Sequence, residues 1–206
     1  MSYAFYDCGY LKNLDLSNLN TSNLTNIDFM FYSCQKLTKL DLSNFDTSKV
    51  TTMASVFKGC LALINLDLSN FDTRKVISMR EMFSDCSNLV DLDLSSFDVM
   101  KVENIDKMFY ICKNLTNLKS FKNLGKGYTL KSSNYINYKL NLSYSTLLTH
   151  ESLMDVINNL YDLNLTYKVA GGGKLYTQSL VLGATNLAKL TAEEINSATL
   201  KGWTVS

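Results

Sequence analysis

Cysteine is the residue type in this sequence whose spacing first suggests chemistry, because thiolates bind metals, form disulfides and act as nucleophiles. The five cysteines recur at a fixed interval of 26 residues and are Cys8, Cys34, Cys60, Cys86 and Cys112. Structural zinc sites use close pairs such as C-x-x-C, and the sequence contains no such pair. Equivalent side chains in stacked repeats point the same way, which is poor geometry for a disulfide. We therefore predict reduced cysteines that are buried one above another in a core.

Histidine is the second residue type that could do chemistry, and the sequence contains one, His150. It follows Thr149 at the expected start of a helix, and nothing in the sequence places it beside a thiol or hydroxyl group that it could activate. We expect a partly exposed residue in the first helical turn. No triad, paired carboxylates, phosphate-binding loop or metal cluster stands out. We therefore expect no enzyme activity, no catalytic residue, no metal site and no cofactor.

A column of aspartates shares the same interval and consists of Asp15, Asp41, Asp67 and Asp93. Each aspartate lies between two leucines, so its side chain should point outward from an extended segment. Like charges about 5 Å apart repel by about 1 kcal/mol or less per pair in water, and something should offset this repulsion. One interpretation is hydrogen bonding to the neighbouring serine and asparagine columns. The other is an acidic strip that meets a cationic or polyhydroxyl partner; a calcium site is disfavoured because no loop clusters oxygen ligands.

A second outward column lies two residues before the aspartates, and its residue types vary. A regular scaffold with a varied outer column is how repeat proteins build extended binding surfaces. The two columns together form the candidate binding face, which consists of Asn13, Asp15, Lys39, Asp41, Asn65, Asp67, Asp91, Asp93, Asn117 and Lys119.

The elements that must position this face can be read from one repeat unit. Its leucines follow the L-x-x-L-x-L spacing of a short strand and are Leu37, Leu40 and Leu42. Oxygens of residues 46–48 could cap a helix, and the apolar side chains over residues 50–57 recur at spacings of 3 and 4. Each unit is thus predicted to be a strand, a turn and a short helix that bury their apolar sides by stacking.

The repeat resembles a known family. The phrase LDLSNFDTSKV at residues 40–50, followed by Met53 and Phe57, is similar to the BspA-like leucine-rich repeat of bacterial surface proteins. The resemblance covers residues 1–125. It implies an α/β leucine-rich-repeat solenoid with a parallel sheet on one face, short helices on the other, and a C-terminal cap. Residues 147–153 and 183–190 resemble the tail that often follows such repeats in low-GC Gram-positive bacteria and phage-like tail proteins, which implies surface recognition.

Residues 126–206 depart from the period and are predicted to hold an irregular segment followed by C-terminal capping repeats. Glycines and a Ser, Asn and Tyr cluster mark the irregular part. The expected elements, in order, are a strand at 139–143, a helix capped by Thr149 and running to about Leu160, a hairpin at 165–177, a strand at 179–182, a helix with a Thr191–Glu194 capping box that Gly202 could end, and an edge strand at 203–205.

Charge and hydropathy exclude some partners. The net charge is +1, which favours neither nucleic acid nor an anionic membrane. No apolar run reaches the ~18 residues of a membrane span, and no signal peptide is visible. Residues 3–8 align with residues 29–34, so we expect the chain to start inside a repeat and to have an upstream domain.

The resulting hypothesis is a non-enzymatic module for recognition or adhesion. Its partner is expected to be a protein or a cell-surface glycan or other envelope ligand, bound on the solenoid face. The expected setting is the bacterial cell surface, the secreted fraction or a phage particle. The alternative is a structural spacer of a larger multidomain protein.

Overall fold

The computed structural model describes residues 1–122, 124–126, 139–163 and 178–206. The fold is mixed α/β, with short parallel sheets and few helices. Strands β1 (Asp91–Asp93) and β2 (Asn117–Lys119) form one sheet, and β3 (Lys139–Asn141), β4 (Gln178–Val181) and β5 (Trp203–Val205) form the other. The helices are α1 (His150–Asn159), α2 (Gly183–Leu187) and α3 (Ala192–Leu200).

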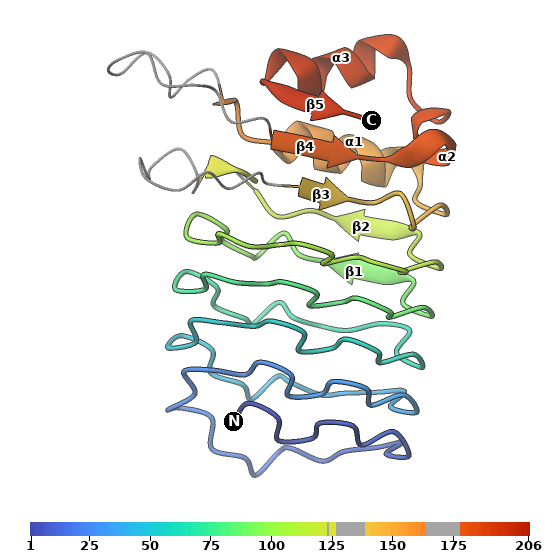
Figure 1. The fold of residues 1–206 in the computed structure, drawn as a ribbon. Helices are drawn as coiled ribbons and strands as arrows, with labels where there is room; N and C mark the ends of the chain where they lie inside the picture. Colours follow the sequence, from blue (N-terminus) through green and yellow to red (C-terminus); the bar gives the residue numbers. More distant parts are fainter. Residues whose placement is uncertain (123, 127–138, 164–177) are drawn as a thin grey trace.

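Residues 1–122 run as successive windings stacked in one direction, with the N-terminus at one end and the C-terminal elements at the other (Figure 1). The windings pair in parallel at the interval of the sequence repeat. Strand β1 pairs with β2 in the register Asp91↔Asn117, and an isolated bridge joins Asn65 to Asp91. On the opposite side, parallel bridges connect Asn26, Thr52, Ser78 and Asn104 in turn.

The helices predicted within the repeats were wrong. Residues 54–59 and their equivalents form a run of consecutive turns, which we call the turn run. The backbone is left-handed at Ser55 (φ 56°) and Gly59 (φ 76°), and a right-handed helix cannot pass through such residues. Alternate N–H groups donate to the next winding instead, from Ser55 to Arg80 O at 2.8 Å and from Phe57 to Met82 O at 3.0 Å. The apolar side chains that recur at spacings of 3 and 4 over residues 50–57 therefore belong to a turn run and not to a helix.

The core lies between the strand side and the turn run, and it is built from columns of identical residues. Phe5, Phe31, Phe57, Phe83 and Phe109 stack with ring centroids 5.5 to 5.9 Å apart. Each cysteine from the second onward lies beside this stack and donates its thiol to a phenylalanine carbonyl of the preceding winding, as Cys60 Sγ does to Phe31 O at 3.1 Å. Four of the five cysteines are buried and reduced, as predicted, whereas Cys8 in the first winding is exposed.

Polar side chains inside the stack are satisfied in the same repeating manner. The buried Thr47 hydroxyl donates to Asp72 O at 3.1 Å and accepts from Asp72 N at 2.7 Å, and Thr73 repeats the arrangement with Asp98. Asp46 accepts from Ser48 N at 2.9 Å, so the predicted capping contact is present but opens a turn. These bonds satisfy buried backbone groups, which would otherwise cost about 1 to 3 kcal/mol each.

Helix α1 closes the edge of the first sheet. Ser152 Oγ accepts from Leu118 N at 2.9 Å, and Asp155 Oδ2 accepts from Ser120 N at 2.6 Å. Two side chains of a helix thus occupy the place that a further strand would take. The first turn of α1 was correctly predicted, because Thr149 caps it by accepting from Ser152 N.

The remaining C-terminal elements largely follow the predictions. The strands predicted at 139–143, 179–182 and 203–205 are present as β3, β4 and β5, and the predicted Thr191–Glu194 capping box opens α3. The structure adds that the three strands pair in parallel in that order. Helix α2 was missed because it spans five residues and has no side-chain cap. It is held instead by buried Asn186, which donates to Leu142 O at 3.1 Å. The predicted hairpin at 165–177 lies outside the described residues.

Candidate functional site

The predicted binding face is exposed throughout, and its two columns lie on the strand side of the stack. All of its members are exposed: Asn13, Asp15, Lys39, Asp41, Asn65, Asp67, Asp91, Asp93, Asn117 and Lys119. The leucines between them face the core; Leu92, for example, is buried between Asp91 and Asp93. The inward and outward alternation predicted from the sequence is therefore confirmed.

Each aspartate of the column is fixed by a short local turn. In the second winding, Asp41 Oδ1 accepts from Ser43 N at 2.9 Å, and the same bond recurs from Ser17 N to Asp15, Ser69 N to Asp67 and Ser95 N to Asp93. This bond to the serine backbone lowers the pKa of Asp15, Asp41 and Asp67 below the ordinary value. For Asp93 the serine side chain is the main cause. The carboxylates are therefore ionised at neutral pH despite their mutual repulsion.

The turn itself does not require a carboxylate. Asn141 in β3 stands at the corresponding place in the sequence KLNLS, which matches KLDLS at residues 39–43. Its Oδ1 accepts from Ser143 N at 3.0 Å and from Ser143 Oγ at 2.7 Å, as an aspartate would. Since an amide oxygen suffices for the turn, the negative charge of the aspartate column is not needed for local structure.

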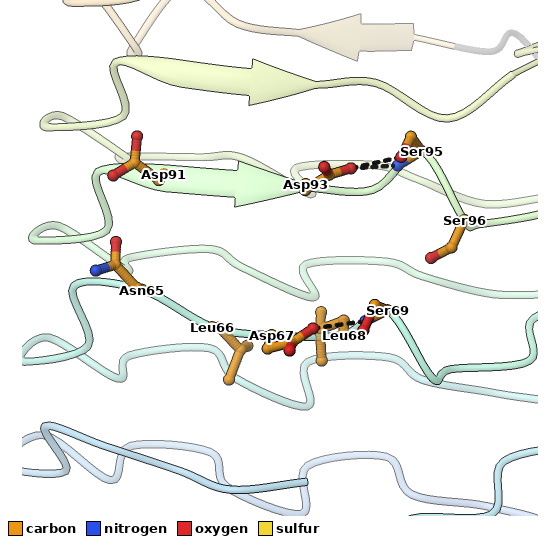
Figure 2. A pocket seen from close by; sticks show the side chains of 9 residues that line it. All are labelled: Asn65, Leu66, Asp67, Leu68, Ser69, Asp91, Asp93, Ser95 and Ser96. Atoms are coloured by element: carbon orange, nitrogen blue, oxygen red, sulfur yellow. Dashed lines mark hydrogen bonds between the residues drawn. The ribbon is translucent and has the colours of Figure 1, made fainter. Parts of the chain in front are cut away.

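Two shallow pockets lie on this face between neighbouring windings. The first has a volume of about 450 Å³ and opens between the windings of Asp67 and Asp93 (Figure 2). Its lining consists of Asn65, Leu66, Asp67, Leu68, Ser69, Asp91, Asp93, Ser95 and Ser96. A second pocket of about 90 Å³ lies one winding closer to the N-terminus and shares Asp67 and Ser69, with Asp41 on its other side.

A third pocket, of about 260 Å³, lies where the face meets helix α1. Asn117 and Lys119 contribute from β2, and Glu151 and Asp155 contribute from α1. Lys119 Nζ donates to Asp93 Oδ2 at 3.0 Å, which raises the pKa of Lys119 and ends the acidic column with an ion pair. The sequence analysis did not assign the α1 carboxylates to this face. Their only sequence signal was a position in the first turns of a helix that follows the repeats.

The pockets bring together part of the predicted face. Asn65, Asp67, Asp91 and Asp93 line one pocket, whereas Asn13, Asp15 and Lys39 line none of these three. His150 is exposed at the start of α1, as predicted, and its Nε2 lies 2.9 Å from Glu194 Oε1.

Two features of the described residues bear on metal binding and on insertion into a membrane. No group of three or more His, Cys, Asp or Glu side chains in this part of the chain could hold a metal ion. Nor is any of the described helices both long and apolar enough to cross a membrane.

Comparison with known proteins gives one match. No curated protein and no solved structure matches the chain. The family model described as "Mycoplasma protein of unknown function, DUF285" matches residues 1–123, which include all the regular windings. The chain belongs to this family of unknown function.

Proposed function

We propose that residues 1–125 are a leucine-rich-repeat solenoid of the BspA-like kind, in which the turn run replaces the short helices. The proposal is supported by the parallel register of β1 and β2, by the bridges from Asn26 to Asn104, and by the stacked phenylalanine column. Each winding contributes one position to every column, as the coils of a solenoid do.

We further propose that the chain is a non-enzymatic binding module that uses the strand face for recognition or adhesion. The ligand is a protein or a cell-surface glycan or other envelope component. The observation that carries this proposal is the aspartate column, which keeps a charge that its turns do not need, beside pockets between the windings. Asn141 shows that the chain can build the same turn without charge. An ionised carboxylate accepts hydrogen bonds from cationic groups and from sugar hydroxyls alike.

The setting that we propose is a bacterial surface or a phage-tail-like particle. It rests on the resemblance to bacterial surface repeats.

The test uses charge removal that preserves the turns. The triple variant Asp41→Asn, Asp67→Asn and Asp93→Asn keeps each Oδ1 acceptor, so the thermal unfolding midpoint should stay within a few degrees of the wild type. A matched control, Asp46→Asn, Asp72→Asn and Asp98→Asn, removes the same number of charges from residues that line none of the three pockets.

Both variants and the wild type would be immobilised and exposed to bacterial envelope fractions, host matrix proteins and a glycan array. We expect the face variant to lose the ligands that the wild type and the control retain. Absence of any retained ligand, or equal retention by the face variant, would contradict the proposal.

A structural spacer is the alternative. The observation that favours it is the column of stacked phenylalanines, buried from Phe31 to Phe109, which makes the windings a continuous packed core. A spacer predicts that no ligand is captured specifically and that the face variant behaves as the wild type in every assay.

A further inference from the structure

Asparagine side chains fill a recurring set of backbone carbonyls between neighbouring windings. Asn70 Nδ2 donates at 2.9, 3.3 and 3.1 Å to three carbonyl oxygens of the preceding winding, which belong to Leu42, Ser43 and Phe45. Asn44 makes the same three bonds one winding earlier, and Asn186 Nδ2 likewise donates to three carbonyl oxygens. In each case one nitrogen that carries N–H hydrogens serves all three acceptors.

The next carbonyl set along the stack lacks this donor. Ser96 stands 26 residues after Asn70, and a serine has no amide. The carbonyls at the equivalent positions belong to Leu68, Ser69 and Phe71. Within the described residues, Leu68 O accepts only from Phe71 N, at 3.0 Å, and Ser69 O and Phe71 O receive no hydrogen bond. Three acceptors therefore share a place from which the usual donor is missing.

The missing asparagine coincides with the pocket of about 450 Å³ on the candidate binding face. The counterpart of this pocket one winding earlier is lined by Asn70 and has a volume of about 90 Å³. Leu68, Ser69 and Ser96 line the larger pocket, with Ser69 on one winding and Ser96 on the other (Figure 2). A ligand in this pocket therefore lies beside acceptors that an asparagine occupies in the neighbouring winding.

The pocket also favours positive charge. Its lining contains the carboxylates of Asp67, Asp91 and Asp93 and no cationic side chain. Asp67 Oδ1 accepts from Ser69 N at 2.9 Å, whereas its Oδ2 receives no hydrogen bond within the described residues. Lys119 pairs with Asp93 from outside the pocket, so two carboxylates keep a charge that no cation balances. A donor group that fills the carbonyl set should therefore be cationic.

We infer that this pocket binds a primary ammonium group on an alkyl stem, as in a lysine side chain of a protein partner. An ammonium group has three N–H donors, one for each carbonyl of the set, whereas an asparagine amide has two. Leu66 and Leu68 line the pocket and offer apolar surface to the methylene groups of the stem. An amino sugar carries its ammonium group on a ring rich in hydroxyls and has no such stem. The inference rests on the proposed binding function and names the chemistry that the face recognises.

The experiment titrates Nα-acetyl-lysine methylamide into the ¹⁵N-labelled full chain at low ionic strength. Saturable shifts are expected in the NMR signals of the Ser69 and Ser95 amides, which lie in the pocket lining. The norleucine analogue keeps the stem without the ammonium group, and the trimethyl-lysine analogue keeps the stem and the charge without N–H donors. Both should bind at least about tenfold more weakly, because a hydrogen bond to a charged group contributes about that factor. Glucosamine should also bind more weakly than the lysine probe.

Ser96→Asn tests the carbonyl set in the protein. The new amide should donate to the three carbonyls as Asn70 does and weaken binding of the lysine probe at least about tenfold. The fold should be preserved, because Asn44 and Asn70 stand in the same column. Ser22→Asn makes the same exchange at an exposed serine that lines none of the three pockets and should leave binding unchanged.

Several results would overturn the inference. One is an absence of shifts at tens of millimolar probe, and another is equal affinity for the wild type and Ser96→Asn. Equal affinity for the trimethyl-lysine analogue would assign binding to the carboxylates alone, and tighter binding of glucosamine would exclude the stem. Displacement of the lysine probe by potassium but not by tetramethylammonium would identify a metal-cation site instead.

Capture from envelope fractions and host matrix proteins separates this inference from the proposed function. If the wild type and Ser96→Asn capture the same partners, the face binds them without an ammonium group in this pocket, and only the inference fails. If the lysine probe binds but the wild type captures no partner, the pocket assignment stands and the proposed function fails.

Discussion

Raising the pH should unfold this protein through its buried cysteines. Cys34, Cys60, Cys86 and Cys112 are each at most 1% exposed and lie beside the phenylalanine column. Burial raises the pKa of Cys34 to about 11 and that of Cys112 to about 12, and it raises the pKa of Cys60 and Cys86 further. An unfolded cysteine ionises near pH 8.5, so between about pH 8.5 and 11 the unfolded chain releases protons that the native chain retains.

The sign of the effect follows from this difference. A group whose pKa is raised by folding stabilises the native state fully below its unfolded pKa, and this contribution is lost as the pH rises toward the folded pKa. Each such thiol lowers the free energy of unfolding by about 1.4 kcal/mol per pH unit. Four thiols give a slope of about 5 kcal/mol per pH unit, which amounts to about 8 kcal/mol at pH 10. The free energy of unfolding of a typical domain is about 5 to 15 kcal/mol, so ionisation of the four thiols should be enough to unfold the protein.

The assay is urea unfolding followed by circular dichroism at intervals from pH 7 to 10, with a reducing agent present. The variant Cys86→Ala removes one buried thiol and leaves a small cavity, so its free energy of unfolding at pH 7 should be about 1 kcal/mol below that of the wild type. Because one ionising thiol is gone, its free energy of unfolding should fall with pH less steeply than that of the wild type, by about 1.4 kcal/mol per pH unit. Its curve should cross that of the wild type, and above about pH 9.5 the variant should be the more stable protein. Cys8→Ala changes an exposed thiol, so its plot of the free energy of unfolding against pH should run parallel to that of the wild type. Parallel curves for Cys86→Ala as well would refute the reasoning.

Three further predictions concern the columns and one ion pair. Phe57→Ala should lower the free energy of unfolding by about 3 to 5 kcal/mol in urea titrations, because it empties the middle of the ring stack; a loss below about 1 kcal/mol would argue against a packed column. Thr47→Val keeps the side-chain shape but leaves Asp72 N and O without partners, so it should cost about 1 to 3 kcal/mol, while Thr25→Val at an exposed site should cost little. The Arg74 guanidinium lowers the pKa of Asp72 to about 2, so Arg74→Gln should raise that pKa in an NMR titration, and the pair should add stability above about pH 4 that fades as the pH falls toward 2. An unchanged Asp72 titration would exclude the pairing in solution.

The repeat columns could be assigned from the sequence because each depends on one property of the stack. Phenylalanine and cysteine recur at the repeat interval, and equivalent residues of stacked windings meet, so their burial follows from the period. The outward aspartates followed from alternation within an extended segment. Thr149 and Thr191 marked the starts of α1 and α3, because a capping hydroxyl acts within three residues of its own position.

The candidate face was only partly accessible to the same reasoning. The sequence indicated its two columns, but it did not indicate that Glu151 and Asp155 complete a pocket beside Lys119. That pocket exists because α1 packs on β2, although the two elements are separated by about 30 residues in the chain. Nor did the sequence show that Asn65, Asp67, Asp91 and Asp93 share one pocket while Asp15 lies outside the three pockets.

The sequence by itself determined the interval, the buried columns, the outward polar face and the caps of the longer helices, since each rests on local geometry or on identity at a fixed spacing. The tertiary structure decided how the backbone of each repeat is folded between its apolar residues. A spacing of 3 and 4 satisfies both a helix and a run of turns. The choice is made by N–H groups such as that of Ser55, which donates to Arg80 in the next winding, 25 residues away, instead of to its own helical turn. Such a bond exists only when the windings are already stacked, and no local reading of the sequence contains it.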